Sequence, residues 1–309
     1  MRQLLNKGWR VRCLVHKDFK ALSNLDVEIA RGSLSDTKFL SSNMEDCDVV
    51  FHSAAYVAVE NINIPLMHEI NVVGTKNMCQ AALDANIPKL IHFSSVHAFQ
   101  QTPTNEPLDE TRPLVNNKNA PPYDRTKAEG QQIIYNACNK GLNAVILHPT
   151  GIIGPFDFKP SRMGKVLLDI MKRKMLININ AGFNWVDVRD VSNSAIKCIT
   201  AGKQGQHYIL PGEWATFKQI STIISNQLHF TTNYLTLPFW SAYIALPFAF
   251  ILSKLTGERP SFSRGSLHAL AEQCQKIPGA LARDEIGHQS RPLIETIKDT
   301  ITWFQKNAN

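Results

Sequence analysis

The chain has 309 residues, 44% hydrophobic and 19% charged, with a formal net charge of +7. This length fits one large α/β domain or a large domain with a smaller one attached, and the composition is that of a globular protein with a substantial core. The positive charge is spread along the sequence, which favours anionic ligands such as nucleotides and argues against nucleic acid as a partner. The six cysteines have no metal-ligand spacing, so we expect reduced thiols, a cytoplasmic protein and no metal site.

Helices and strands are predicted to alternate along most of the chain. Strands are expected at residues 9–15, 27–30, 48–52, 89–94, 143–147 and 207–210. Helices are expected at residues 1–7, from about 37, at 65–86, and from an entry at Pro121-Pro122 through 127–140. Alternation of this kind is typical of an α/β fold with a parallel sheet.

The most hydrophobic stretch of the chain is residues 237–252. It falls short of the ~20 apolar residues that a membrane span needs, and Pro238 and Pro247 interrupt it. We expect a helix that packs over a substrate pocket. Contact with a membrane surface is the less favoured interpretation.

Tyr123 and Lys127 stand four residues apart and would share one face of a helix. An ammonium beside a phenol favours the phenolate, which suits general acid–base chemistry. The same spacing also arises by chance, as a packed ring next to a solvated charge. The apolar strand that ends in Ser94 and Ser95 favours the functional interpretation, because a hydroxyl there can bind the oxygen that reacts.

With these motifs the chain resembles the extended short-chain dehydrogenase/reductase family, also described as the NAD-dependent epimerase/dehydratase superfamily. It is most similar to the branch of dihydroflavonol 4-reductase-like proteins, 3β-hydroxysteroid dehydrogenases and hopanoid-associated sugar epimerase-like proteins. The motifs that carry the resemblance are His52-Ser53-Ala54-Ala55, Asn71-Val72-Val73-Gly74-Thr75, Phe93-Ser94-Ser95, Tyr123-Asp124-Arg125-Thr126-Lys127, Gly154-Pro155 and Trp185-Val186-Asp187-Val188-Arg189-Asp190-Val191. Their order and spacing are specific for the fold and superfamily, and say little about the substrate.

The resemblance implies an α/β fold with a Rossmann-like, doubly wound parallel sheet and a smaller, mostly helical C-terminal lobe. The dinucleotide-binding domain would comprise residues 1–155 and also 183–211. The substrate-binding lobe would comprise residues 156–182 and 212–309.

The resemblance also implies an NAD(P)-dependent oxidoreductase that acts on a carbonyl or alcohol of a small organic substrate. Tyr123 would exchange the proton, Ser95 would bind the reacting oxygen, and Lys127 would hold the nicotinamide ribose and lower the pKa of Tyr123. Asn71 would support a proton relay to Lys127. Ser94 is the alternative hydroxyl, but the family pattern favours Ser95.

Cofactor contacts are expected mainly where the strands end. The expected residues are His16, Lys17, Ser33, Leu34, His52, Ala54, Ala55, Ser94, Tyr123, Lys127, Pro149, Gly151 and Ile152. Lys17 could accept the 2′-phosphate of NADP, so we slightly favour NADP over NAD, although His16-Lys17 could equally be a solvated turn. Ser33 stands where relatives usually carry the Asp that binds adenine. His52 is favoured as a packed, hydrogen-bonded residue over a catalyst, and Asp187 and Asp190 are favoured as structural caps.

The family's first strand and its glycine-rich turn are not found in this sequence. That turn brings the backbone and a helix N-terminus to the cofactor pyrophosphate. One hypothesis is that the chain begins at an internal Met, and the other is a natural truncation that leaves a binding protein without catalysis. Either way we expect weak dinucleotide binding and a sheet without its middle strand.

Three alternatives to the reductase remain at this stage. A nucleotide-sugar epimerase would use the same Tyr and Lys without net redox change. A hydroxysteroid dehydrogenase would use the apolar stretch 237–252 to cover its substrate. A cofactor-deficient binding protein would lack activity. Relatives usually pair through helices, so a homodimer is expected.

Overall fold

The computed structural model describes residues 1–57, 63–174, 177–231, 235–244, 246–247, 267, 270–271 and 273–307. The helices are α1 (Arg2–Leu5), α2 (Thr37–Ser42), α3 (Ile64–His68), α4 (Gly74–Asp84), α5 (Pro122–Cys138), α6 (Arg162–Met171), α7 (Val188–Ala201), α8 (Phe217–Gln227), α11 (Ala280–Ile286) and α12 (Leu293–Asn307). The strands are β1 (Arg12–Val15), β2 (Glu28–Arg31), β3 (Val50–His52), β4 (Leu90–Phe93), β5 (Ala144–Pro149), β6 (Gly151–Ile153), β7 (Ile177–Ile179), β8 (Gly182–Asp187), β9 (His207–Leu210), β10 (Glu213–Thr216) and β11 (Leu235–Leu237).

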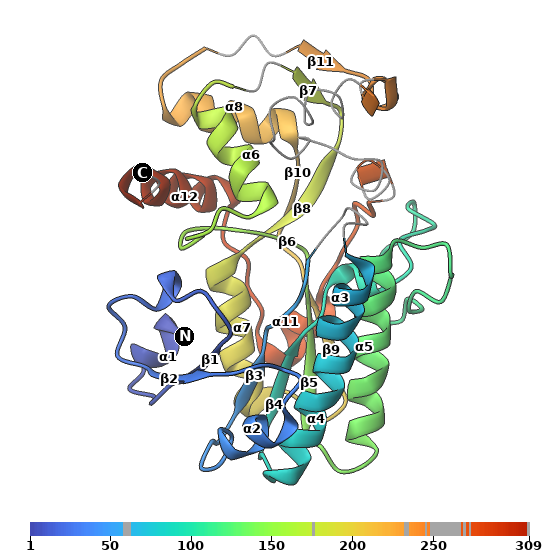
Figure 1. Cartoon of the computed structure of the whole chain (residues 1–309). Coiled ribbons are helices and arrows are strands. Elements are labelled where there is room, and N and C mark those ends of the chain that lie inside the picture. The colour runs from blue at the N-terminus through green and yellow to red at the C-terminus, as the bar shows by residue number, and fades with distance from the viewer. Residues whose placement is uncertain are drawn as a thin grey trace.

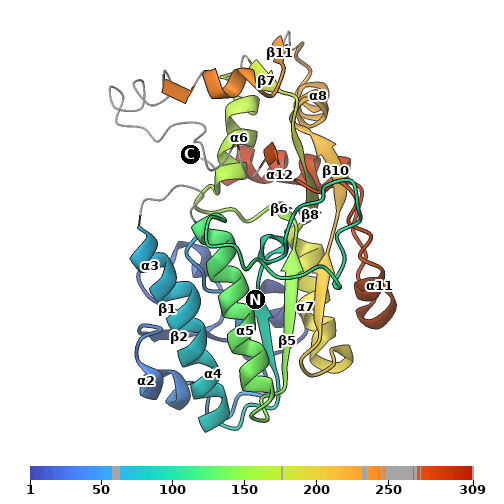
Figure 2. The ribbon, with the colours of Figure 1, turned by 90° about the vertical axis from the view of Figure 1, so that its right-hand side faces the viewer.

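The central sheet is parallel throughout, in the order β3-β4-β5-β9. Helices α4 and α5 cover one face and α7 and α11 cover the other, as Figure 2 shows. Alternate strand residues supply the two cores: Leu90 and Ile146 pack toward α4 and α5, whereas Val145 and Leu147 pack toward α7. Burial on both faces explains why these strands are continuously apolar. The predicted α/β class with a parallel sheet is confirmed.

The strands β1 and β2 form a separate parallel pair at one side of the central sheet (Figure 1). Among the described residues, no strand is hydrogen-bonded between β1 and β3. This break lies where we expected the middle strand to be missing. Leu14 of β1 and Ile29 of β2 are accordingly 39% and 47% exposed, high values for apolar side chains in a sheet.

A second group of elements stands above the carboxyl ends of the central strands (Figure 1). Strand β8 pairs in parallel with β6 and antiparallel with β10. Trp185 of β8 is buried in a core built with α6, α8 and α12, and its indole N–H donates to the carbonyl of Ala215 at 2.9 Å. This sheet carries the chain away from β5 and back to α7, so it connects the two parts of the molecule.

The apolar stretch 237–252 is described only in part. Residues 241–244 are helical, and Trp240 and Ile244 are 63% and 62% exposed. Residues 245 and 248–252 lie outside the described residues, so the expected packing over a pocket stays a prediction. No helix in the described part of the chain is long and apolar enough to cross a membrane.

We predict that Gly212→Ala will unfold more readily than the parent protein. Gly212 lies between β9 and β10, and a Cβ there would stand 1.7 Å from the carbonyl oxygen of Trp185. The backbone must shift, so we expect a loss of about 3 kcal/mol in the free energy of unfolding. The matched control is Gly205→Ala, where a Cβ meets nothing within 4 Å and only the positive φ of 72° is strained. It should cost about 1 kcal/mol. Equal losses in urea titrations would contradict this interpretation.

Candidate active site

Helix α5 brings Tyr123 and Lys127 to the carboxyl end of β4. The helix begins at Pro122, where a missing N–H costs nothing, as the predicted entry at Pro121-Pro122 requires. Lys127 is only 5% exposed, and its Nζ donates to the carbonyl of Phe93, the last residue of β4, at 3.1 Å. Burial lowers the pKa of Lys127 to about 8. The expected arrangement of the pair on one helix face is therefore present.

Ser95 is the hydroxyl that meets the phenol. Its side chain lies close enough to the phenol to lower the pKa of Tyr123 by hydrogen bonding. Ser95 also caps the short turn that follows β4, because its Oγ accepts from the backbone N–H of His97 at 3.2 Å. The Ser94 hydroxyl is buried without a hydrogen-bond partner in the described part of the chain. Of the two serines, the structure brings Ser95 to Tyr123, as the family pattern favours.

The expected effect of Lys127 on the pKa of Tyr123 is wrong for the protein alone. Burial raises the pKa of Tyr123 to about 12, the hydrogen bond from Ser95 offsets part of this, and Asp124 raises the pKa further. Lys127 is not among the groups that set this shift, and its ammonium donates to the Phe93 carbonyl. Loss of solvation outweighs the neighbouring charge, so the phenol keeps its proton at neutral pH.

Asn71 links the segment after β3 to α5 by side-chain hydrogen bonds. It lies in a π-helical turn, Glu69–Val73, between α3 and α4. Its Oδ1 accepts from the Tyr56 N–H at 2.7 Å, and its Nδ2 donates to the Tyr56 carbonyl and to Thr126 Oγ1, both at 3.1 Å. The side chain is thus occupied by these partners and not by Lys127. The relay role of Asn71 stays a prediction.

Three buried histidines stand in the strands beside Lys127. They are His52 of β3, His92 of β4 and His148 of β5. Burial, with a smaller contribution from Lys127, lowers the pKa of His52 and of His148 to about 3 and that of His92 well below its usual value. All three are neutral at pH 7. His52 bonds to Thr75 Oγ1 at 3.2 Å, as expected for a packed residue.

Sequence reasoning missed His92, His97 and His148. The imidazole of His97 lies edge-on to Tyr123, with ring centroids 6.4 Å apart, and its Nδ1 is 3.6 Å from Asp124. The positions of His92 and His148 at strand ends gave a signal, because strand residues there face the ligand edge of a parallel sheet.

The remaining predicted cofactor residues also lie near carboxyl ends of strands. His16 and Lys17 follow β1 and are exposed. Ser33 follows β2 and bonds to Ser35 Oγ at 2.9 Å, whereas Leu34 packs in the core beside α4. The others are Ala54 and Ala55 after β3, Pro149 at the end of β5, and Gly151 and Ile152 in β6.

These residues fit the nicotinamide-ribose end of a dinucleotide. The Lys127 ammonium has one hydrogen-bond acceptor in the described part of the chain, which leaves two N–H groups for ribose hydroxyls. The buried Ser94 hydroxyl is a further group that a bound molecule could satisfy. The sequence contains no glycine-rich turn for the pyrophosphate.

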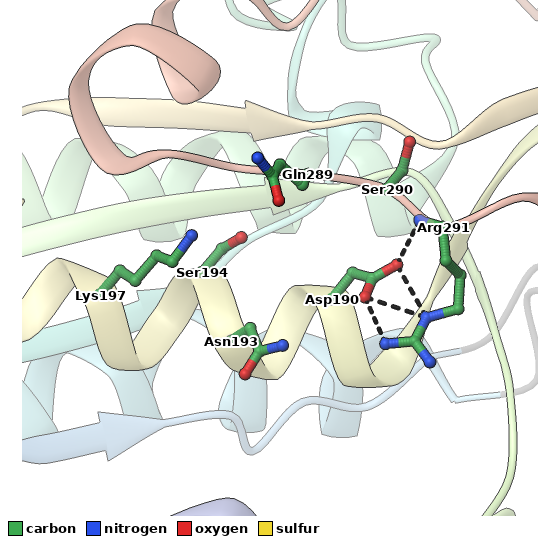
Figure 3. Close-up of a pocket in the computed structure, with 7 residues that line it drawn as sticks. All are labelled: Asp190, Asn193, Ser194, Lys197, Gln289, Ser290 and Arg291. Carbon is green, nitrogen blue, oxygen red and sulfur yellow. Dashed lines mark hydrogen bonds and ion pairs between the residues drawn. The ribbon is translucent and has the colours of Figure 1, made fainter.

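A pocket of about 310 Å³ lies elsewhere, between α7 and the segment before α12 (Figure 3). Its charged side chains already have partners within the protein. Arg291 Nη2 is 2.6 Å from Asp190 Oδ1, and Lys197 Nζ donates to the Gly287 carbonyl. Asp187 caps α7 by accepting from the Arg189 N–H at 2.7 Å. The cap predicted for Asp187 is present, whereas Asp190 caps no end of a described helix and pairs with Arg291 instead.

Comparison with known proteins places the chain in a family. The sequence profile described as the NAD dependent epimerase/dehydratase family matches residues 1–210. The chain belongs to this family. Its members are NAD(P)-dependent enzymes, which agrees with the resemblance drawn from the motifs. Neither the profile match nor the fold distinguishes NAD from NADP.

Two curated relatives and one solved structure are similar over much of their length. A Synechocystis sp. protein named provisionally as a dihydroflavonol 4-reductase is 28% identical over 100% of this chain and 91% of its own. Sterol demethylase protein B of Methylococcus capsulatus is 31% identical over 71% of this chain and 67% of its own. The crystal structure of gox2253 is 29% identical, with a TM-score of 0.84 over 99% of this chain and 93% of that one.

We predict that Lys127→Met will stabilise the protein at pH 7. The unfolded chain binds the lysine proton more tightly than the folded one between pH 8 and the ordinary value of 10.5. Stability should therefore rise with pH in this window, and at pH 7 the buried charge costs on the order of 3 kcal/mol. The advantage of the variant should shrink as pH rises toward 10. Lys140→Met, at an exposed lysine after α5, is the control. A pH-independent difference in urea unfolding would contradict the predicted shift.

Proposed function

We propose that the protein is an NAD(P)-dependent oxidoreductase that interconverts a carbonyl and an alcohol on a small organic substrate through Tyr123, Lys127 and Ser95. The observation that carries this proposal is the arrangement of Tyr123 and the buried Lys127 one turn apart on α5, with Lys127 bonded to the end of β4 and the Ser95 hydroxyl after β4 close enough to lower the pKa of Tyr123. Two hydroxyl groups that meet at the ligand edge of a parallel sheet can together hold one reacting oxygen.

When bound, the nicotinamide supplies the hydride in the reducing direction. The high pKa of Tyr123 keeps the phenol protonated until negative charge develops on the substrate oxygen. Tyr123 then donates its proton to that oxygen, while the Ser95 hydroxyl donates a hydrogen bond to it. Lys127 holds the ribose hydroxyls with its two remaining N–H groups, and Asn71 keeps α5 in place through Thr126.

Sterols are the substrate class that the named relatives favour. Besides sterol demethylase protein B, they include a sterol-4-alpha-carboxylate 3-dehydrogenase of Candida albicans, 27% identical over 70% of this chain. A dihydroflavonol is the second class to test, after the name of the Synechocystis relative. A nucleotide-sugar epimerase is supported by fold alone, since the UDP-glucose 4-epimerase of Thermotoga maritima is 15% identical with a TM-score of 0.79.

The finer features of the proposal rest on the resemblance. They are the preference for NADP through Lys17, the pairing into a homodimer, and the division into a dinucleotide domain (1–155 and 183–211) and a substrate lobe. The exposure of Lys17 after β1 supports its availability to a 2′-phosphate.

The central test is Tyr123→Phe, assayed with 3β-hydroxysteroids, 3-oxosteroids and dihydroflavonols by the change in reduced nicotinamide absorbance. Without the phenolic proton, kcat should fall by about 10²–10⁴-fold. The dissociation constant for the cofactor should change less than about twofold, because the phenyl ring keeps the packing. Tyr208→Phe removes a hydroxyl that bonds to Glu285 of α11, away from Tyr123, and should leave kcat unchanged.

A kcat of Tyr123→Phe equal to that of the parent protein would contradict the proposed mechanism. Formation of an epimer from a nucleotide sugar without net oxidation or reduction of the cofactor would instead favour the epimerase.

We predict that Lys17→Ala will weaken the binding of NADP by about tenfold while NAD binding stays the same, because only NADP offers a 2′-phosphate to the ammonium. Calorimetric titration with each cofactor measures both constants. Lys7→Ala, at another exposed lysine, is the matched control. Equal changes in the dissociation constants of NAD and NADP would contradict this role and would indicate that His16-Lys17 is a solvated turn.

A further inference from the structure

The carbonyl of Ser95 is held by the side chain of His148 and by its own turn, and not by the backbone of a neighbouring strand. Backbone hydrogen bonding between β4 and β5 extends as far as Ser94, whose N–H donates to the Leu147 carbonyl at 2.8 Å. Ser95 is the next residue, and its carbonyl oxygen accepts from the Ala98 N–H of its own turn at 3.0 Å and lies 2.8 Å from Nδ1 of His148. The chain leaves the sheet at this point, and His148 is the group that ties the Ser95 carbonyl to β5, whereas the Ala98 N–H bonds it within the turn.

The tautomer of His148 follows from its partner. A carbonyl oxygen only accepts hydrogen bonds, so Nδ1 carries the proton and donates. The ring is fully buried and neutral at pH 7, and Nε2 has no partner in the described part of the chain. His148 therefore donates a single hydrogen bond, from its Nδ1–H, to the Ser95 carbonyl.

Packing fixes the orientation of the His148 ring. Phe99 lies on one side with ring centroids 4.6 Å apart, and His207 stands edge-on at 5.7 Å. Phe99 itself ends the turn that Ser95 begins, and it is 1% exposed. The turn from Ser95 to Phe99 thus wraps around His148, contacting it by a hydrogen bond at its start and by a ring at its end.

We propose that His148 is a positioning residue for the chemical step, which holds Ser95 in hydrogen-bonding contact with Tyr123. This inference rests on the proposed function. His148 acts only through Ser95, so its loss should matter when Ser95 has a hydroxyl to position and should be without effect when that hydroxyl is absent.

A double-mutant cycle tests this dependence with Ser95→Ala, His148→Phe and the double variant of the full chain. Ser95→Ala should lower kcat by about 100-fold. His148→Phe keeps a ring of similar size without the N–H and should lower kcat by about tenfold, with the KM for cofactor unchanged. The double variant should match Ser95→Ala within about twofold. His148→Asn retains a donor near the Nδ1 position and should recover kcat to within about threefold of the parent.

Losses that multiply in the double variant, or a folded His148→Phe with parental kcat, would overturn the inference and leave the proposed function intact. Should His148→Phe fail to fold, two measurements still decide. One is the kcat of His148→Asn, and the other is ¹⁵N NMR of histidine-labelled parent protein, where His148 must show a protonated Nδ1 and a bare Nε2. The opposite tautomer, or a tenfold loss in His148→Asn, would overturn the inference. A parent protein that turns over no carbonyl or alcohol would instead remove the proposed function.

Discussion

The burial of an ammonium and a phenol at the end of β4 is the constraint on which the candidate site depends. Lys127 and Tyr123 lose much of their solvation there, which lowers the pKa of Lys127 to about 8 and raises that of Tyr123 to about 12. Both shifts favour the neutral forms, but only the lysine shift costs the folded state stability at neutral pH, because the phenol is protonated in the folded and unfolded chains alike. The protein compensates with directed hydrogen bonds, from Lys127 to the Phe93 carbonyl and from Ser95 to the phenol.

The surrounding structure holds these few groups at fixed distances. Asn71 joins the segment after β3 to α5, and His148 joins β5 to the turn after β4. Each contact links two elements that are far apart in sequence, so the site is determined by the packing of the whole sheet. The neutral histidines beside Lys127 add no positive charge, which lets a buried ammonium persist next to them.

Local sequence predicted the elements and the residue types of the site, because strand apolarity and helical spacing are properties of neighbouring residues. It could not predict the pKa of Tyr123: the spacing to Lys127 shows a nearby charge, whereas the dominant effect is burial by distant residues. The preference for Ser95 over Ser94 followed the family pattern. Its structural reason is that the Ser94 N–H still bonds to β5, whereas the chain leaves the sheet at Ser95. The role of His148 depends on register between β4 and β5, which no local pattern encodes.

The ionisation of Lys127 tests this account most directly. A ¹³C NMR titration of lysine-labelled protein, with Lys127→Met to assign the signal, gives the midpoint for its Cε. The account predicts a midpoint of about 8, because the buried ammonium has exchanged water for a single carbonyl. A midpoint near the ordinary 10.5 would show that Lys127 is solvated, and would contradict the claim that burial at the end of β4 organises the site.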